Sequence, residues 1–290
     1  MAYEYDIIVI GGGRSGLSTV STIVRQSHKT VLFDSGEYRN ALSKHMRTVP
    51  TWDHQDPARF RAASRVDFNR YGSVTVENVE IENIKKRDDG LSEATADRKT
   101  WTGKKLILAT GIEDVFPDIP GYAECWVSAI FHCLFYHGWE ETGAASSGIL
   151  AVGDVGAADP ALHFARQALR ISGRVTLYAD GDEGLAKELA ATLESAPAPM
   201  TVDSRKIAKR LLAHKPEHKL RGNLARQLGI EITPRNVLQI SPPFNQTNVK
   251  GVFAAGDDAE LYWALYVGTL AGAGAPPQIQ AETYNQKGVF

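Results

Sequence analysis

The chain has 290 residues, of which 43% are hydrophobic and 23% charged, so a disordered or fibrous protein is excluded and two domains of about 150 residues are expected. Its 32 basic and 34 acidic residues give a net charge of -2, which is unsuited to general binding of nucleic acid or of an acidic membrane. Two cysteines cannot form a disulfide framework, and they indicate a reducing compartment, the cytoplasm.

No targeting or membrane segment is expected. The N-terminus has no basic region before its first apolar run, which stops at glycine after four residues, so it does not resemble a signal peptide. The longest weakly polar stretch, residues 262–275, is glycine-rich and shorter than the roughly 20 residues that span a bilayer. We therefore expect a soluble protein without a membrane partner.

The first 34 residues predict a β-α-β unit of the Rossmann type. Residues 7–10 are a continuous run of β-branched residues that ends in glycine, which is typical of a parallel strand buried on both faces. A helix follows from about Ser15, and residues 30–34 form the next predicted strand.

A glycine motif of the form G-x-G-x-x-G follows the first predicted strand directly. Gly11 permits the tight turn, Gly13 lets a pyrophosphate approach the backbone, and Gly16 permits close packing of helix and strand. The helix that begins near Ser15 offers free N–H groups to the diphosphate. Asp34, at the end of the second strand, would bind a ribose 2′-hydroxyl and repel a 2′-phosphate. The motif alone does not distinguish FAD from NAD.

The middle of the first domain is predicted from weaker patterns. Residues 57–71 suggest a short helix, and alternating apolar residues over 74–107 suggest an antiparallel meander. Residues 106–111 read as another buried strand, which ends at Ala109, Thr110 and Gly111. Prolines follow at once and mark an exit from the domain.

A second β-α-β pattern begins near residue 148. It continues with a helix over 159–171, a strand over 174–178 and further α/β alternation to about residue 239. After Pro242-Pro243, residues 252–257 form a last strand that leads into a helix over 261–271. The fold class is therefore α/β with two Rossmann-like dinucleotide-binding domains, the second inserted in a discontinuous first. We place the first domain at 1–114 and 243–290, and the second at 115–242.

The later glycine segments point to FAD. Ala109-Thr110-Gly111 and Ala255-Gly256-Asp257, together with the N-terminal motif, resemble the flavin domain of reductases with two dinucleotide folds. The resemblance covers nearly the whole chain. It implies that FAD is the cofactor and that Asp257, beside Gly256, contacts its ribityl or diphosphate part.

Two longer segments sharpen this resemblance. The segment F-D-S-G-E-Y-R-N begins at Phe33 and is followed by His45, and the segment C-L-F-Y-H-G-W-E begins at Cys133. Both look like the fungal thioredoxin-reductase-like flavoproteins, whose members include the dithiol oxidases of gliotoxin and holomycin biosynthesis.

That resemblance implies further cofactor contacts and an assembly. Arg39, Asn40 and His45 would line the FAD, and Val79 would offer its backbone to the adenine. The resemblance also implies a homodimer.

The second glycine motif departs from the family pattern. Val155 stands where a second glycine is needed, so its β-branched side chain is expected to obstruct a pyrophosphate, and Asp154 adds repulsion. The acidic segment 178–183 follows the next strand, where the relatives place arginines for the NADP 2′-phosphate. NADPH selectivity therefore has no visible basis, although Asp180 could still accept the ribose of NADH.

The redox motif departs as well. The relatives carry C-x-x-C, but here Tyr136 takes the second position after Cys133. Dithiol exchange needs one thiolate to attack and another to resolve the mixed disulfide, so the standard mechanism is lost. Nothing in the spacing shows that Cys125 could replace the missing partner.

A histidine is retained beside the lost cysteine. Flavin oxidation of a carbon substrate usually needs a base, and His137 is the residue we expect to serve, with His132 as the weaker neighbour. Tyr136 would orient a substrate oxygen or shield the flavin. No zinc spacing is present, and His214 and His218 are expected on a solvated helix face without a role.

We therefore predict an FAD-dependent oxidoreductase that oxidises a small secondary metabolite by two electrons with O2 as acceptor. One alternative is a dithiol oxidase or disulfide reductase that uses Cys133 with Cys125. Another is a flavin-binding partner protein without turnover, because an enzyme that has lost its activity would also have lost the second glycine motif and the C-x-x-C motif.

Overall fold

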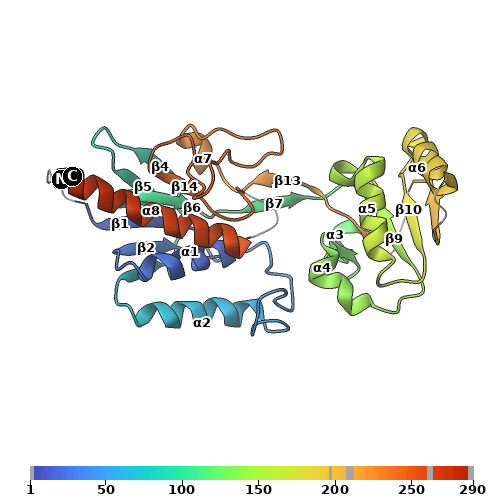
Figure 1. Ribbon diagram of the computed structural model, residues 1–290, viewed down its shortest axis with the longest axis horizontal. Helices are drawn as coiled ribbons and strands as arrows, with labels where there is room; N and C mark the ends of the chain where they lie inside the picture. The colour runs from blue at the N-terminus through green and yellow to red at the C-terminus, as the bar shows by residue number, and fades with distance from the viewer. Residues whose placement is uncertain (1–2, 196–197, 207–211, 260–263, 287–290) are drawn as a thin grey trace. The chain divides into compact units, whose positions relative to one another are not determined.

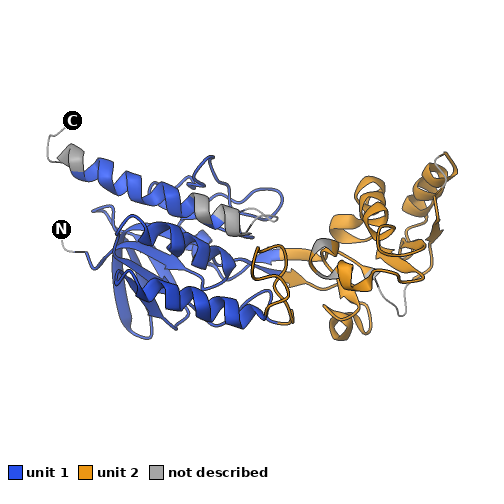
Figure 2. Cartoon of the chain, turned by 60° about the horizontal axis from the view of Figure 1, so that its bottom comes forward, with its two compact units in different colours: residues 1–41, 56–113, 219–290 blue, residues 42–55, 114–218 orange. Residues whose placement is uncertain are grey.

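The chain folds into two compact units, each with its own sheet. The computed structural model describes residues 3–195, 198–206, 212–259 and 264–286 (Figure 1). The first unit comprises Met1–Ala41, Asp56–Glu113 and Lys219–Phe290, and the second comprises Leu42–Gln55 and Asp114–His218 (Figure 2). The second unit thus interrupts the first, as the sequence predicts.

The described part of the first unit is built on a mixed sheet. Its order is β3-β2-β1-β6-β5-β4, and β14 also pairs with β6. Strands β3, β2, β1, β6 and β14 run parallel, while β4, β5 and β6 form antiparallel pairs. The bounds are β1 Tyr5–Ile10, β2 Thr30–Phe33, β3 Val74–Glu77, β4 Asn83–Lys86, β5 Ser92–Ala96, β6 Lys99–Leu108 and β14 Val252–Ala254.

The parallel strands bring five chain segments to one edge. Strand β1 is central and its residues Ile7, Ile8 and Val9 are fully buried, as its continuous apolar run predicts. The antiparallel meander is wrong for β3, which pairs parallel with β2. Consequently the carboxyl ends of β1, β2, β3, β6 and β14 share an edge, which is where open α/β sheets bind ligands.

Two helices of this unit pack with their backbones almost in contact. Helices α1 (Arg14–Val24) and α8 (Ala264–Gln286) lie side by side in Figure 1. A Cβ on Gly268 would lie 2.3 Å from the Ser15 carbonyl oxygen, and one on Gly272 would lie 2.5 Å from that of Thr19. Thr19 Oγ1 donates to the Gly268 carbonyl at 2.9 Å. Helix α8 is longer than predicted, and residues 261–263 of that prediction lie outside the described residues.

The second unit has a parallel sheet of order β11-β10-β9-β12-β8 in its described part. Its core joins this sheet to helices α5 and α6 through Ile149, Leu177, Ala161 and Leu189. The elements are α3 Tyr122–Cys125, β8 Ile130–Phe131, α4 Leu134–His137, η1 Gly138–Glu141, β9 Ser147–Leu150, η2 Gly153–Val155, α5 Ala158–Ala168, β10 Val175–Tyr178, α6 Glu183–Ser195, β11 Met200–Asp203 and β12 Leu212–Ala213.

The chain returns to the first unit earlier than expected. Regular α/β alternation stops after β12, and strands β7 (Ile112–Val115) and β13 (Glu217–Leu220) pair where the chain leaves and re-enters. Beyond Lys219, the side chains of Leu224, Ile230 and Leu238 belong to the first unit's core. Helix α7 (Leu224–Gln227) packs on β4, so the expected boundary at 243 is too late.

A second departure concerns residues 42–55, which pack with the second unit. Arg47 is buried and forms an ion pair with Glu140. The ring of His54 meets that of Trp139 at a centroid distance of 6.0 Å. The partners are about 90 residues apart, so no local pattern indicated this contact. Among the described residues, no helix is long and apolar enough to cross a membrane.

Candidate functional site

The glycine turn after β1 has the geometry that a pyrophosphate requires. Gly11 has φ +119°, and a Cβ there would lie 2.1 Å from the Ala109 carbonyl oxygen. A Cβ on Gly16 would lie 1.8 Å from the Gly11 oxygen, whereas one on Gly13 would have no atom of the described residues within 4 Å. Among the described residues, no side chain caps the N-terminus of α1, and the first turn of α1 has no acidic residue. The first-turn N–H groups therefore face an open space that suits a diphosphate.

Asp34 lies at the end of β2, and its side chain is almost fully buried. Its Oδ1 accepts from Gly36 N at 2.9 Å, and its Oδ2 accepts from Tyr38 Oη at 2.8 Å and from Arg65 Nη2. Burial and the bond to Asp34 raise the pKa of Tyr38. A ribose hydroxyl would therefore share this carboxylate with Arg65 of α2 (Pro57–Asn69), and Arg65 offsets the negative charge expected to repel a 2′-phosphate.

Arg65 was not predicted. Helix 57–71 was predicted and carries arginines at positions 61 and 65, one turn apart, but nothing local placed that face against β2. Arg61 stacks on the Tyr38 ring at 3.7 Å, and its Nη1 lies 3.5 Å from Asn40 Oδ1. Asn40 is thus linked to Asp34 through Arg61 and Tyr38.

The remaining predicted cofactor residues divide between the two units. Arg39 Nη1 pairs with Asp257 Oδ2 at 3.0 Å, and Val79 follows β3 at the ligand edge. His45 lies instead in the segment 42–55 of the second unit, where its Nδ1 is 3.1 Å from the His54 carbonyl oxygen. The structure therefore groups every predicted cofactor residue except His45 within the first unit.

A second carboxyl, missed in the sequence, lies directly after Asp257. Asp258 is fully buried, and its Oδ2 accepts from Thr110 N at 2.9 Å, Thr110 Oγ1 at 2.9 Å and Gly111 N at 3.2 Å. Its Oδ1 is buried and has no hydrogen-bond partner among the described residues. Burial, with a smaller contribution from Asp257, raises the pKa of Asp258 to about 7. The doubled acid at a strand end was the only local signal.

These features fit a bound dinucleotide. The open amide face at Gly13, the carboxylate at the end of β2 and an unpartnered buried oxygen beside the turn after β6 all lie at the carboxyl edge of one sheet. Gly256 joins them, since a Cβ there would lie 2.3 Å from Ser15 Oγ.

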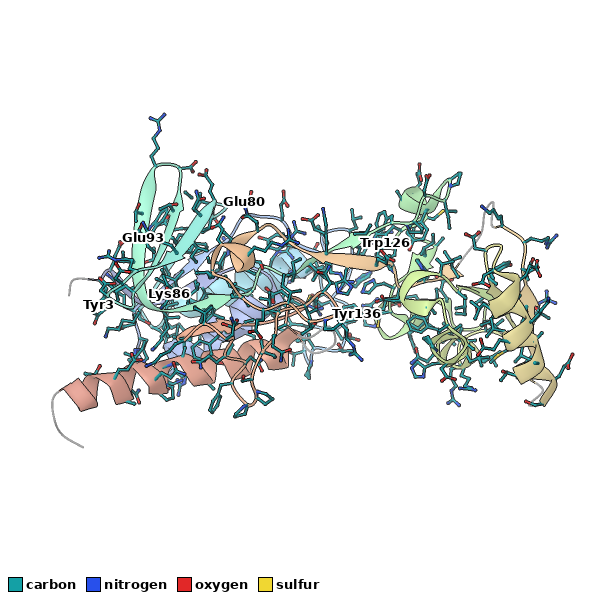
Figure 3. The ribbon with its side chains drawn as sticks, turned by 90° about the horizontal axis from the view of Figure 1, so that it is seen from above. Tyr3, Glu80, Lys86, Glu93, Trp126 and Tyr136 are labelled. Carbon is teal, nitrogen blue, oxygen red and sulfur yellow. The ribbon has the colours of Figure 1, made fainter. Side chains whose placement is uncertain are left out.

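The redox motif lies on α4 in the second unit. Cys133 precedes this helix, and Tyr136 N donates to the Cys133 carbonyl at 3.1 Å. The rings of Tyr136 and His132 stack with their centroids 6.4 Å apart, and those of His132 and Trp126 stack with centroids 5.7 Å apart. Trp126 and Tyr136 are labelled in Figure 3. No disulfide joins Cys125 and Cys133. The backbone of His137 ends α4, but its side chain lies outside the described part of the structure.

The second glycine motif departs from the dinucleotide pattern, but the side chain of Val155 does not obstruct it as predicted. Residues 153–155 form the short helix η2, and Val155 is buried in the core, so its side chain does not stand over the turn. Asp154 pairs with Lys215 at 3.0 Å. A Cβ on Gly181 would lie 3.5 Å from Lys206, so a basic side chain does accompany the acidic segment. The local sequence window around 178–183 did not include it.

His214 also differs from its prediction. It follows β12 and is almost fully buried, so the solvated helix face is wrong. Its Nδ1 lies 2.5 Å from Tyr122 Oη and its Nε2 lies 3.3 Å from the Val152 carbonyl oxygen. Burial lowers the pKa of His214 to about 4 and raises that of Tyr122. Within the described residues, no group of three or more His, Cys, Asp or Glu side chains could hold a metal ion.

Known proteins are similar to this chain in sequence. The sequence pattern of the family described as pyridine nucleotide-disulphide oxidoreductase matches residues 5–207. Thioredoxin reductase tcpT of Claviceps purpurea is 42% identical, over 98% of this chain and 97% of its own length. Thioredoxin reductase sirT of Leptosphaeria maculans is 37% identical, over 93% of each.

Solved structures agree with these relatives. An oxidoreductase from Agrobacterium tumefaciens has a TM-score of 0.84 at 26% identity and covers 96% of this chain and 99% of its own. HlmI has a TM-score of 0.81 at 23% identity, over 98% of this chain and 94% of its own. The chain therefore belongs to the pyridine nucleotide-disulphide oxidoreductases, as a thioredoxin-reductase-like flavoprotein that depends on FAD.

Proposed function

We propose that this FAD-dependent oxidoreductase removes two electrons from a small secondary metabolite and transfers them to O2, without a dithiol pair. The substrate loses a hydride and a proton, and O2 gains two electrons and two protons to become hydrogen peroxide. The observation that carries the proposal is Tyr136 in the second position of the C-x-x-C motif, where its ring is stacked on that of His132.

The protein's own residues would hold the cofactor and handle one proton. In the first unit, Gly11, Gly13, Ser15 and Gly16 would hold the diphosphate, and Asp34 the adenosine ribose. FAD, when bound, supplies a hydride acceptor. In the second unit, His137 would take the substrate proton, and Tyr136 would orient a substrate oxygen. The stack with His132 supports this role for Tyr136, because it restrains the tyrosine ring.

The closed second glycine motif supports O2 rather than a nicotinamide as redox partner. The turn that would need open amides for a pyrophosphate is here the short helix η2, and Asp154 in this helix pairs with Lys215. Lys206 is the basic side chain that could favour NADPH instead. Reduction of the flavin by NADPH is therefore the sharpest test.

The holoprotein is mixed anaerobically with NADPH, NADH, a small dithiol and extracts that contain candidate metabolites, and flavin bleaching is followed. We expect bleaching by a metabolite and not by the other three, with one peroxide formed per substrate once O2 is admitted. The variants Cys133→Ser and Cys125→Ser should retain that turnover, and His137→Ala should lose it while retaining FAD. Rapid bleaching by NADPH, or loss of turnover in either serine variant, would contradict the proposal.

We also propose a homodimer by family resemblance, which light scattering tests.

A further inference from the structure

Asp258 joins the two turns that follow β6 and β14. Its Oδ2 receives three hydrogen bonds from Thr110 and Gly111, although 148 residues separate Thr110 from Asp258. Its own carbonyl oxygen accepts from Leu238 N at 2.6 Å. The side chain is fully buried, so these contacts are shielded from water. Asp258 therefore sets the conformation of the Ala109–Gly111 turn.

The two oxygens of this carboxyl have opposite environments. Three donors converge on Oδ2, whereas Oδ1 is buried and lacks any partner among the described residues. A charged oxygen without a donor is costly in the protein interior. A proton on Oδ1 lowers that cost, because it neutralises the group, and it leaves Oδ2 free to accept all three bonds. Burial supports the same assignment, because it raises the pKa of Asp258 to about 7.

Oδ1 is enclosed by protein near Gly256 and the start of α1. It lies 4.0 Å from the position of a Cβ on Gly256, and that position is itself 2.3 Å from Ser15 Oγ, at the start of α1. Among the described residues, the ionisable groups on the segments next to Asp258 include Asp257 and its partner Arg39, Arg14 at the start of α1, and Glu231 and Arg235 before Leu238.

We propose that Asp258 is a positioning residue of the FAD site that acts as the neutral acid: the proton stays on the enclosed Oδ1 while Oδ2 accepts from the Thr110-Gly111 turn. Ionisation would place a second negative charge beside Asp257, the residue that family resemblance places against the ribityl or diphosphate part of FAD, and would so weaken binding of the anionic cofactor. FAD binding and the proton on Asp258 are therefore coupled, whichever electron acceptor the enzyme uses.

The test measures FAD affinity of the flavin-free full-length protein between pH 6 and 9, by quenching of FAD fluorescence. Wild type should bind more weakly as the pH rises above about 7, by up to tenfold per pH unit. Asp258→Asn should show no such slope, because its amide oxygen still accepts from the turn and its side chain stays neutral at every pH. Asp258→Ala should bind weakly at every pH.

A matched control and a second measurement keep the result decisive. Asp89→Asn alters a carboxyl of the β4–β5 hairpin that pairs with Arg87 at 2.9 Å, and it should keep the wild-type slope. Calorimetric titration of wild type at pH 8, in two buffers of different ionisation enthalpy, should show uptake of about one proton per FAD. The proposal is overturned by a flat wild-type profile, by the same slope in Asp258→Asn, or by absence of proton uptake. The uptake measurement needs no variant, so it holds even where Asp258→Asn fails to fold.

Discussion

Tyr136 takes the second position of the C-x-x-C motif, which gives a prediction for sulfur chemistry in the second unit. Tyr136 N donates to the Cys133 carbonyl, so both positions lie on one turn of α4. Tyr136→Cys would restore a C-x-x-C motif at a helix N-terminus, where thiolates are stabilised. We expect a small dithiol, losing two electrons and two protons, to bleach the flavin of this variant anaerobically and not that of wild type. Tyr136→Ser, which adds no thiol, is the control, and equal bleaching in all three proteins would contradict the prediction.

Residues of the site were predictable where their partners lie close in sequence. The glycine motif and Asp34 fall within one β-α-β unit, so spacing alone placed them together. Asp258 and Arg65 were missed because their partners are 148 and 31 residues away, and only the sheet order brings them together. The same limit hid the buried pair of Tyr122 and His214, whose histidine appeared in a basic, polar stretch.

At the scale of elements, strand direction was the main uncertainty. The alternating pattern of residues 74–107 is compatible with either pairing, and β3 runs parallel to β2 because its partner is an earlier strand rather than its neighbour in sequence. That choice brings Val79 to the ligand edge. The β4–β5–β6 part did form the predicted antiparallel hairpins, since short turns leave no other pairing.

The packing of α1 on α8 gives a prediction for stability. A Cβ on Gly272 would lie 2.5 Å from the Thr19 carbonyl oxygen, so Gly272→Val must separate the two helices. We expect a loss of about 1–3 kcal/mol in the free energy of unfolding, together with weaker FAD binding, because α1 carries the phosphate-binding turn. Urea unfolding measures the first effect. Ala281→Val, at an exposed position of α8, should unfold like wild type, and equal stability of both variants would contradict the prediction.

Each unit has a sheet with parallel strands, and the carboxyl edges of these strands differ between the two units. The turn after β1 is open at Gly13, whereas the turn after β9 is occupied by η2, with Asp154 held by Lys215. Similar sequence patterns predicted both sheets, because buried strands and helix starts look alike in each. The patterns did not predict which residues would close the second edge, since Lys215 lies far along the chain.

Each unit also carries a buried titratable side chain, and burial shifts the two pKa values in opposite directions. The stabilities of the two units should therefore depend on pH in opposite ways. The pKa of Asp258 is raised to about 7, so between about pH 4 and 7 the folded state holds a proton that the unfolded state has lost, and rising pH destabilises the first unit. The pKa of His214 is lowered to about 4, so between about pH 6.5 and 4 the unfolded state gains a proton that the folded state rejects, and falling pH destabilises the second unit.

Urea unfolding of the flavin-free protein at pH 5 and at pH 8 separates these effects through two variants. Asp258→Asn should gain stability relative to wild type on going from pH 5 to pH 8, by a few kcal/mol at about 1.4 kcal/mol per pH unit. His214→Gln should lose less stability than wild type on going from pH 7 to pH 5, because glutamine cannot be protonated at its acceptor. If each variant keeps the wild-type pH dependence, neither residue is the titrating group, and the first result would also remove the basis for a neutral Asp258 in the FAD site.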